Sequence, residues 1–251
     1  MMRRALIKQH IYIGFWMLFV VFIQPIKAQF SDSFTVYYTK TTNLHKNLGN
    51  EPWMENIKKA VPKYTKEKFI LKGKNGISHY YPLPKEEGEA QIPVWISNGS
   101  TNEIVTQGDS FTLRKEVYEL KVRVRDSVIP FKWKITNDKR SIAGYNCRKA
   151  IARFQDTVMI YAFYAEELVG TSGPEVVQGL PGVILGLGIP TYNTTWFADK
   201  VELNATGFNP VLKPVKKEKE YNRESFRTEL KIIFKGGWDN RIEKTYWKLF
   251  F

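Results

Sequence analysis

Short stretches of alternating apolar and polar residues run through most of the chain, a pattern typical of β-strands with one buried face. Residues 34–40, Phe-Thr-Val-Tyr-Tyr-Thr-Lys, predict a first strand because they are rich in aromatic and β-branched side chains. In residues 116–125 the apolar side chains are expected to face a core and the basic ones water. Further strands are predicted at residues 94–97, 103–107, 131–136, 183–187 and 195–203.

Two pairs of predicted strands are separated by tight-turn sequences. Residues 66–72 and 77–81 flank Gly73-Lys-Asn-Gly76, and an Asn-Gly pair is a strong signal for a hairpin. Residues 147–154 and 157–164 flank Gln155-Asp156 in the same way. We therefore expect neighbouring strands to be joined mainly by hairpins.

Helical spacing of apolar residues occurs in two places. Residues 51–61 carry apolar side chains at 53, 54, 57 and 61, with Asn50 as the expected N-cap and Pro52 early in the helix. Residues 214–234 carry Phe226, Leu230 and the pair at 233–234 on one stripe. Because no strand–helix–strand rhythm is present, the sequence predicts a mainly β fold. The expected architecture is a curved antiparallel sheet or half-open barrel with short covering helices.

The N-terminal residues have the three-part pattern of a secretory signal peptide. Arg3, Arg4 and Lys8 precede an apolar stretch, residues 11–23, and Ala28 is the expected cleavage residue. A transmembrane anchor is the alternative, but Gln24-Pro25 interrupts a stretch that would need about 20 apolar residues to span a bilayer. We predict a signal peptide at 1–28 and a single domain at 29–251, exported to the periplasm or outer-membrane surface of a Gram-negative bacterium.

Composition narrows the possible partners. The formal net charge is +13, and aromatic residues make up 14% of the chain. A basic surface keeps a protein soluble and blunts sheet edges, and it also favours anionic partners such as lipid headgroups. Nucleic acid is not expected as a partner after export. The aromatic content is the feature that indicates an apolar ligand, because aromatic side chains commonly line ligand sites.

Candidate reactive groups are few. Cys147 is the only cysteine, so no internal disulfide can form, and the expected role is a small buried hydrophobe, with a reactive thiol as the alternative. Beyond residue 28 the histidines are His45 and His79, which lack a partner at metal-ligand spacing. Gly179-Leu-Pro-Gly182 is not followed by the Lys and Ser/Thr of a phosphate loop. We predict no metal and no cofactor.

Gly179-Leu-Pro-Gly182 instead predicts a tight corner that delivers the apolar run 183–185 into a sheet, because glycine supplies unusual backbone angles and proline fixes φ. It closes a series of elements: Trp133-Lys-Ile, Ile142-Ala-Gly-Tyr-Asn-Cys-Arg-Lys-Ala150, Ser172-Gly-Pro174 and Gly179-Leu-Pro-Gly-Val-Ile-Leu185. In this order they resemble the GLPGLI family, exported proteins common in Bacteroidetes with no assigned activity. The chain departs from the family at three places. It has Phe163 where the family usually has Trp, Leu168-Val169 where the family has Ile-Pro, and Val183 where the family has Ile.

The resemblance implies that the matching residues form the family motif, with a structural role. These residues are Trp133, Gly144, Tyr145, Cys147, Lys149, Ala150, Gly173, Pro174, Gly179, Leu180, Pro181 and Gly182. The family pattern is also similar to the half-open barrels of periplasmic lipoprotein carriers, which is an analogy of fold. Our leading hypothesis is a non-catalytic cell-envelope protein that binds a lipid or other apolar ligand. The alternatives are a structural or partner-binding accessory of an outer-membrane protein and, third, a hydrolase that uses Cys147 or a carboxylate.

Overall fold

The computed structural model describes residues 33–85, 92, 102–117, 120–204, 207–208, 210–233 and 246–251. The described residues belong to one compact unit, Ser31–Phe251. The predicted signal peptide, residues 1–28, and the predicted strand at 94–97 lie outside the described residues. None of the helices within the described ranges has the length and hydrophobicity needed to cross a bilayer.

The protein is mainly β, as predicted. The described strands form one open 12-stranded sheet in the order β12-β6-β5-β4-β3-β2-β1-β11-β10-β9-β8-β7, antiparallel except for the pair β12–β6. The strands are β1 (Ser33–Asn43), β2 (Tyr64–Lys74), β3 (Ile77–Pro82), β4 (Glu103–Gln107), β5 (Ser110–Val117), β6 (Leu120–Ser127), β7 (Lys134–Ile142), β8 (Tyr145–Phe154), β9 (Val158–Ala165), β10 (Val183–Ile189), β11 (Thr194–Leu203) and β12 (Lys219–Tyr221). The helical segments are α2 (Leu44–Asn47), α3 (Met54–Ala60), η1 (Pro190–Tyr192) and α5 (Arg223–Ile233).

The predicted hairpins are confirmed, and their turns explain why. Asn75 and Gly76 have positive φ values of 51° and 74° between β2 and β3, and Gln155 and Asp156 have 48° and 53° between β8 and β9. Two consecutive residues with positive φ make the turn whose twist matches the strands of a hairpin. The local sequence is therefore sufficient to join these neighbours.

The prediction of a single strand over residues 116–125 is wrong. Val117 ends β5 and Leu120 begins β6, and the two residues are paired across the hairpin. Three positions separate them, an odd spacing that would put them on opposite faces of one continuous strand. Because directly paired residues of antiparallel strands lie on the same face of a sheet, Val117 and Leu120 belong to two strands rather than one.

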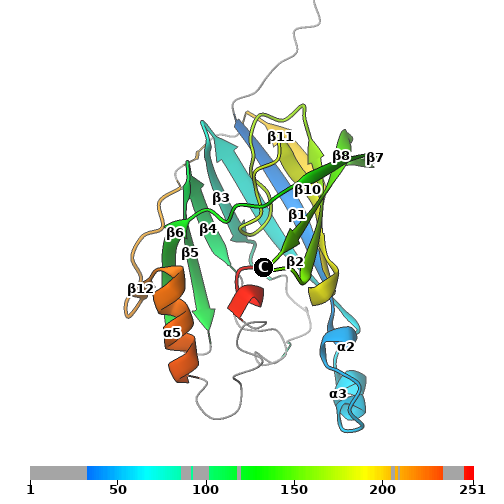
Figure 1. The fold of residues 1–251 in the computed structure, drawn as a ribbon, viewed down its shortest axis with the longest axis vertical. Helices are drawn as coiled ribbons and strands as arrows, with labels where there is room; N and C mark the ends of the chain where they lie inside the picture. Colours follow the sequence, from blue (N-terminus) through cyan, green and yellow to red (C-terminus); the bar gives the residue numbers. More distant parts are fainter. Residues whose placement is uncertain are drawn as a thin grey trace, which may run out of the picture. The chain divides into compact units, whose positions relative to one another are not determined.

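The predicted strand at 131–136 begins later than expected: residues 134–136 lie in β7, which starts at Lys134, whereas residues 128–133 cross from β6 to β7 (Figure 1). Ten strand spacings of about 4.8 Å would separate β6 from β7 by about 48 Å in a flat sheet. The seven peptide steps from Ser127 to Lys134 span at most about 25 Å. The sheet must therefore curve strongly, and the crossing connection lies over its concave face.

The predicted helices are both shorter than expected. In the first, the helix α3 begins at Met54, and the residue before it, Trp53, makes no side-chain capping bond, so the expected cap at Asn50 is not formed. In the second, residues 219–221 form β12, and α5 starts only after Asn222. The Asn222 side chain accepts from Ser225 N at 2.8 Å, and Ser225 Oγ accepts from Asn222 N at 3.0 Å. This reciprocal capping fixes where α5 begins.

Residues 246–251 fill the concave face of the curved sheet (Figure 1). The ring of Phe250 lies 6.3 Å from Phe111 of β5, and the ring of Phe251 lies 5.8 Å from Phe154 of β8. β5 and β8 are eight spacings apart in the sheet order. One short segment thus joins the two halves of the sheet, and we call it the inner segment.

Candidate functional site

The predicted corner, Gly179–Gly182, is a compact backbone turn. Gly182 N donates to Leu180 O at 2.9 Å, which closes a three-residue turn around Pro181. Gly179 has φ +93° and Gly182 has φ +152°, and a Cβ on Gly182 would lie 2.2 Å from the carbonyl oxygen of Ala165. Leu180 is buried and anchors the turn in the core. The glycines are needed for backbone angle and close approach rather than for ligand contact.

The corner closes a loop that runs from residue 171 to residue 182. Gly179 N donates to Thr171 O at 3.0 Å, and the Trp133 indole N–H donates to Gln178 O at 3.0 Å. Gly173 is packed so tightly that a Cβ there would lie 2.8 Å from Ile184. The sequence motif elements around 133, 173 and 179 therefore come together in space.

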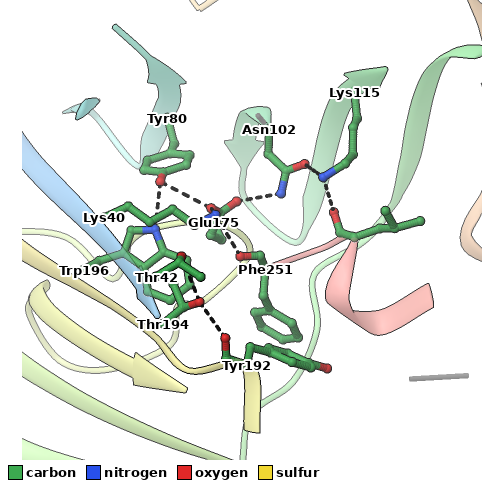
Figure 2. A network of polar contacts seen from close by, with 11 residues as sticks. Lys40, Thr42, Tyr80, Asn102, Lys115, Glu175, Tyr192, Thr194, Trp196 and Phe251 are labelled. Atoms are coloured by element: carbon green, nitrogen blue, oxygen red, sulfur yellow. Dashed lines mark hydrogen bonds and ion pairs between the residues drawn. The ribbon is translucent and has the colours of Figure 1, made fainter. Parts of the chain in front are cut away.

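This loop carries a residue that the sequence reasoning did not single out, Glu175. Pro174 O accepts from Val177 N at 3.2 Å, and Glu175 sits in this turn with φ +57°. Its side chain has 0% exposure and reaches the concave interior (Figure 2). The loop at residues 171–182, which contains motif residues, therefore also places a carboxylate in the interior.

Three donors surround the Glu175 carboxylate (Figure 2). Lys40 Nζ lies 3.1 Å from Oε1, Tyr80 donates to the same oxygen at 3.4 Å, and Asn102 Nδ2 donates to Oε2 at 2.6 Å. Burying an isolated carboxylate would be very costly, so this anion depends on its partners. Trp196 Nε1 in turn donates to the Tyr80 hydroxyl at 3.2 Å. The carboxylate is therefore held in a fixed position.

A second cation, Lys115, completes the network. Its Nζ donates to Asn102 Oδ1 at 3.1 Å and to Leu249 O of the inner segment at 3.4 Å. Asn102 thus bridges the carboxylate and the ammonium group. Burial, with the neighbouring charge of Lys40 adding to it, lowers the pKa of Lys115 to about 8. The interior consequently holds a lysine that can change its charge near neutral pH.

Lys40 connects the network to the aromatic interior. Its Nζ lies 4.8 Å from the centre of the Trp196 ring and 5.6 Å from that of Phe69, distances at which a cation is attracted to a ring. The same Nζ donates to Phe251 O at 3.2 Å. The partly buried Lys40 and the buried Lys115 therefore both bind main-chain oxygens of the inner segment.

The surroundings of the inner segment are dominated by aromatic rings. Trp247 meets Phe154 edge to face at 4.7 Å, and Phe226 of α5 meets Phe250 in the same way at 6.4 Å. Rings in edge-to-face pairs contribute about 0.5–1.5 kcal/mol beyond their burial. The interior is thus aromatic on its walls and polar at one place, around Glu175.

One buried hydroxyl group beside the inner segment has no hydrogen-bond partner among the described residues. Tyr192 is 3% exposed, its ring lies 6.0 Å from that of Phe251, and its hydroxyl makes no hydrogen bond within the described part of the chain. Burial raises its pKa to about 12. An unpaired buried hydroxyl costs about 1–3 kcal/mol. The inner segment therefore leaves one polar group of the interior unsatisfied.

Cys147 lies on β8 and is completely buried. Burial, with the charge of Glu167 adding to it, raises the pKa of the thiol to about 11. Its Sγ lies 3.7 Å from Tyr145 O. A buried, protonated thiol is a poor nucleophile, so the environment favours the structural interpretation over the reactive one.

The other predicted motif residues lie on the β7–β8 hairpin and do not join the Glu175 network. Gly144 has φ +86° in the hairpin turn, and Tyr145 begins β8. Lys149 Nζ pairs with Asp138 Oδ2 at 3.0 Å at the surface, while Ala150 is buried. No cluster of metal-ligating side chains occurs among the residues described.

Part of the network had a signal in the sequence. Lys115 follows Phe111 and Leu113 at alternate positions of β5, and Lys40 follows Val36 and Tyr38 of β1 in the same phase. A lysine in an inward position of a strand is unusual and indicates a buried partner. Asn102 and Glu175 gave no such signal, because neither lies in a regular element.

The fold and interior define a class, an open curved β-sheet that encloses a segment of its own chain. No protein-family model matches the chain, and no curated protein matches it. Among solved structures it is similar to PNGF-II in two crystal forms. For the P21 form the TM-score is 0.53 with 14% identity over 79% of this chain and 33% of that chain. For the C2 form the TM-score is 0.51 with 13% identity over 86% of this chain and 33% of that chain.

The chain thus spans about a third of the length of PNGF-II, and at this identity the likeness shows the fold alone. An uncharacterized conserved protein from Thermus thermophilus aligns at a TM-score of 0.38 and 8% identity, over 78% of this chain and 93% of that one.

Proposed function

We propose that this is an exported, non-catalytic binding protein of the cell envelope, of the GLPGLI type, that holds an apolar ligand against the concave face of its sheet. The proposal rests on the observation that the inner segment occupies that face. The inner segment inserts Phe250 and Phe251 between the two halves of the sheet, so the surrounding residues already accommodate an apolar body. A ligand would take the place of this segment.

Replacement of the inner segment by a ligand is energetically reasonable. A ligand of similar apolar surface would recover much of the hydrophobic stabilisation lost when the rings leave. Self-occupancy would reduce the apparent affinity to the intrinsic affinity multiplied by the fraction of molecules in which the segment is displaced. The Tyr192 hydroxyl supports the proposal, because it has no hydrogen-bond partner among the described residues, those of the inner segment included.

The nature of the buried groups favours binding over catalysis. Glu175 is fully enclosed and bonded by several donors, so it is poorly placed to accept a proton from a substrate. Cys147 is buried on β8 with a raised pKa. These environments argue against the hydrolase hypothesis in both its carboxylate and its thiol version.

The accessory-protein alternative is less well supported, because the edges of the described sheet resist pairing. β12 is only three residues long. β7 is largely exposed, carries Lys134 and Lys139, and changes register between Ile135 and Lys139. Short edges, lysines and bulges all disfavour addition of a partner strand. A partner would therefore have to use another surface.

Native mass spectrometry of the protein purified from an envelope fraction tests the proposal. We expect an additional mass in the lipid range that is released on denaturation. A clean apoprotein mass, together with no uptake of any added amphiphile, would overturn the proposal and leave the partner-binding alternative.

A further inference from the structure

The inner segment contacts the rest of the protein in two chemically different ways. Its rings pack against apolar walls, while two of its main-chain oxygens accept from lysines, one partly buried and one buried. Lys40 binds Phe251 O at 3.2 Å, and Lys115 binds Leu249 O at 3.4 Å. A group that replaces the segment must offer apolar surface and must also offer oxygen acceptors at this position, because losing them would leave buried donors unpaired.

From this pattern we propose that the ligand is an amphiphile with a single apolar chain and an anionic oxygen head group, which Lys40 and Lys115 bind. This inference rests on the proposed function and specifies the chemical class of its ligand. An ammonium group attracts a carboxylate more strongly than an uncharged carbonyl oxygen at the same distance, because the carboxylate carries a full negative charge. An acid head group would therefore improve on the Leu249 carbonyl oxygen that Lys115 binds.

The charges around the site are compatible with one further anion. The charged groups whose fields reach Lys115 are Lys40, Lys248, Glu67 and Glu175. Glu67 lies opposite Lys40 in the β1–β2 register, and Glu175 is held by Lys40 and Asn102. Lys115, by contrast, donates only to uncharged oxygens among the described residues, Asn102 Oδ1 and Leu249 O. The anionic head group of the ligand would give Lys115 an ionised partner.

The polar network also positions the two lysines. Glu175 and Asn102 lie between the two lysines and are hydrogen-bonded to each other (Figure 2). Glu175 pairs with Lys40, and Asn102 accepts from Lys115. Because Glu175 is locked by the 171–182 loop, the ammonium groups keep their place when the segment leaves. The site is therefore organised before the ligand arrives, which lowers the entropic cost of binding.

The test compares dodecanoic acid with dodecan-1-ol, which share a chain and differ in the head group. We expect the wild-type protein at pH 7 to bind the acid about tenfold more tightly than the alcohol. Lys40→Gln and Lys115→Gln should reduce that ratio to near one, while Lys121→Gln, at an exposed position of β6, should leave it unchanged.

A measurement on the wild-type protein keeps the test independent of how well the variants fold. Raising the pH from 7 to 9 discharges Lys115, so the acid-to-alcohol ratio should fall several-fold. If acid and alcohol bind equally at every pH, the head-group inference is wrong and the proposed function stands. If neither binds, the proposed function itself fails.

Discussion

At the scale of single residues, the unusual feature is a lysine buried in a strand. Lys115 is 8% exposed and lies between Leu113 and Val117 on the inward face of β5. Its ammonium group is tolerated because Asn102 and the inner segment supply acceptors. Burial nevertheless lowers its pKa to about 8 from the usual 10.5. The folded protein thus binds this proton more weakly than the unfolded chain does.

This difference predicts how stability depends on pH. Between pH 8 and 10.5 the unfolded chain holds the proton and the folded protein does not, so the free energy of unfolding rises with pH. The contribution of Lys115 between pH 8 and 9 is about 1 kcal/mol. Urea denaturation of wild type and Lys115→Gln at both pH values measures it as the difference between the two proteins.

The comparison needs the variant because other groups oppose the trend at higher pH. The Cys147 thiol keeps its proton in the folded state up to about pH 11, so above pH 9 it lowers stability as the pH rises. This contribution is common to both proteins and cancels. Parallel pH profiles for wild type, Lys115→Gln and the exposed control Lys121→Gln would contradict the burial of a charged Lys115.

At the scale of elements, what the sequence could predict depends on the range of the interactions. The β2–β3 and β8–β9 hairpins were predictable because Asn75-Gly76 and Gln155-Asp156 determine them locally. The crossing of residues 128–133 was not, because it depends on the curvature of the whole sheet. The same distinction applies to the candidate site. The alternation along β1 and β5 indicates that Lys40 and Lys115 point inward, whereas the position of Glu175 depends on a loop held by hydrogen bonds between residues distant in the sequence.

The corner residue Gly182 gives a prediction at this scale. Gly182→Ala should lower the free energy of unfolding by about 3 kcal/mol, because the new Cβ meets backbone and φ is +152°. Gly144→Ala is the matched control, since Gly144 has φ +86° with open space around it. It should cost about 1 kcal/mol. Thermal and urea denaturation measure both, and equal losses would mean that the corner is not a packing constraint.

At the scale of the whole molecule, a curved sheet, a crossing connection and the inner segment together form one interior. Apolar rings surround the segment, and Lys40, Lys115 and Glu175 form the polar end of the space it occupies. The sequence predicted a curved β fold, and its aromatic content led to the proposal of an apolar ligand, but it did not indicate that part of the chain would occupy the proposed ligand site. Residues 246–251 are too few to reveal such a role by periodicity.

The most direct test of this account is to locate a bound amphiphile on the protein. A long-chain fatty acid with a photoreactive diazirine near its methyl end would be crosslinked, and the adducts would be mapped by peptide mass spectrometry. We predict adducts on interior residues such as Phe111, Phe154 and Tyr192, with less labelling when unlabelled acid competes. Adducts confined to exposed side chains such as Trp53 and Tyr64, insensitive to competition, would contradict ligand binding inside the sheet.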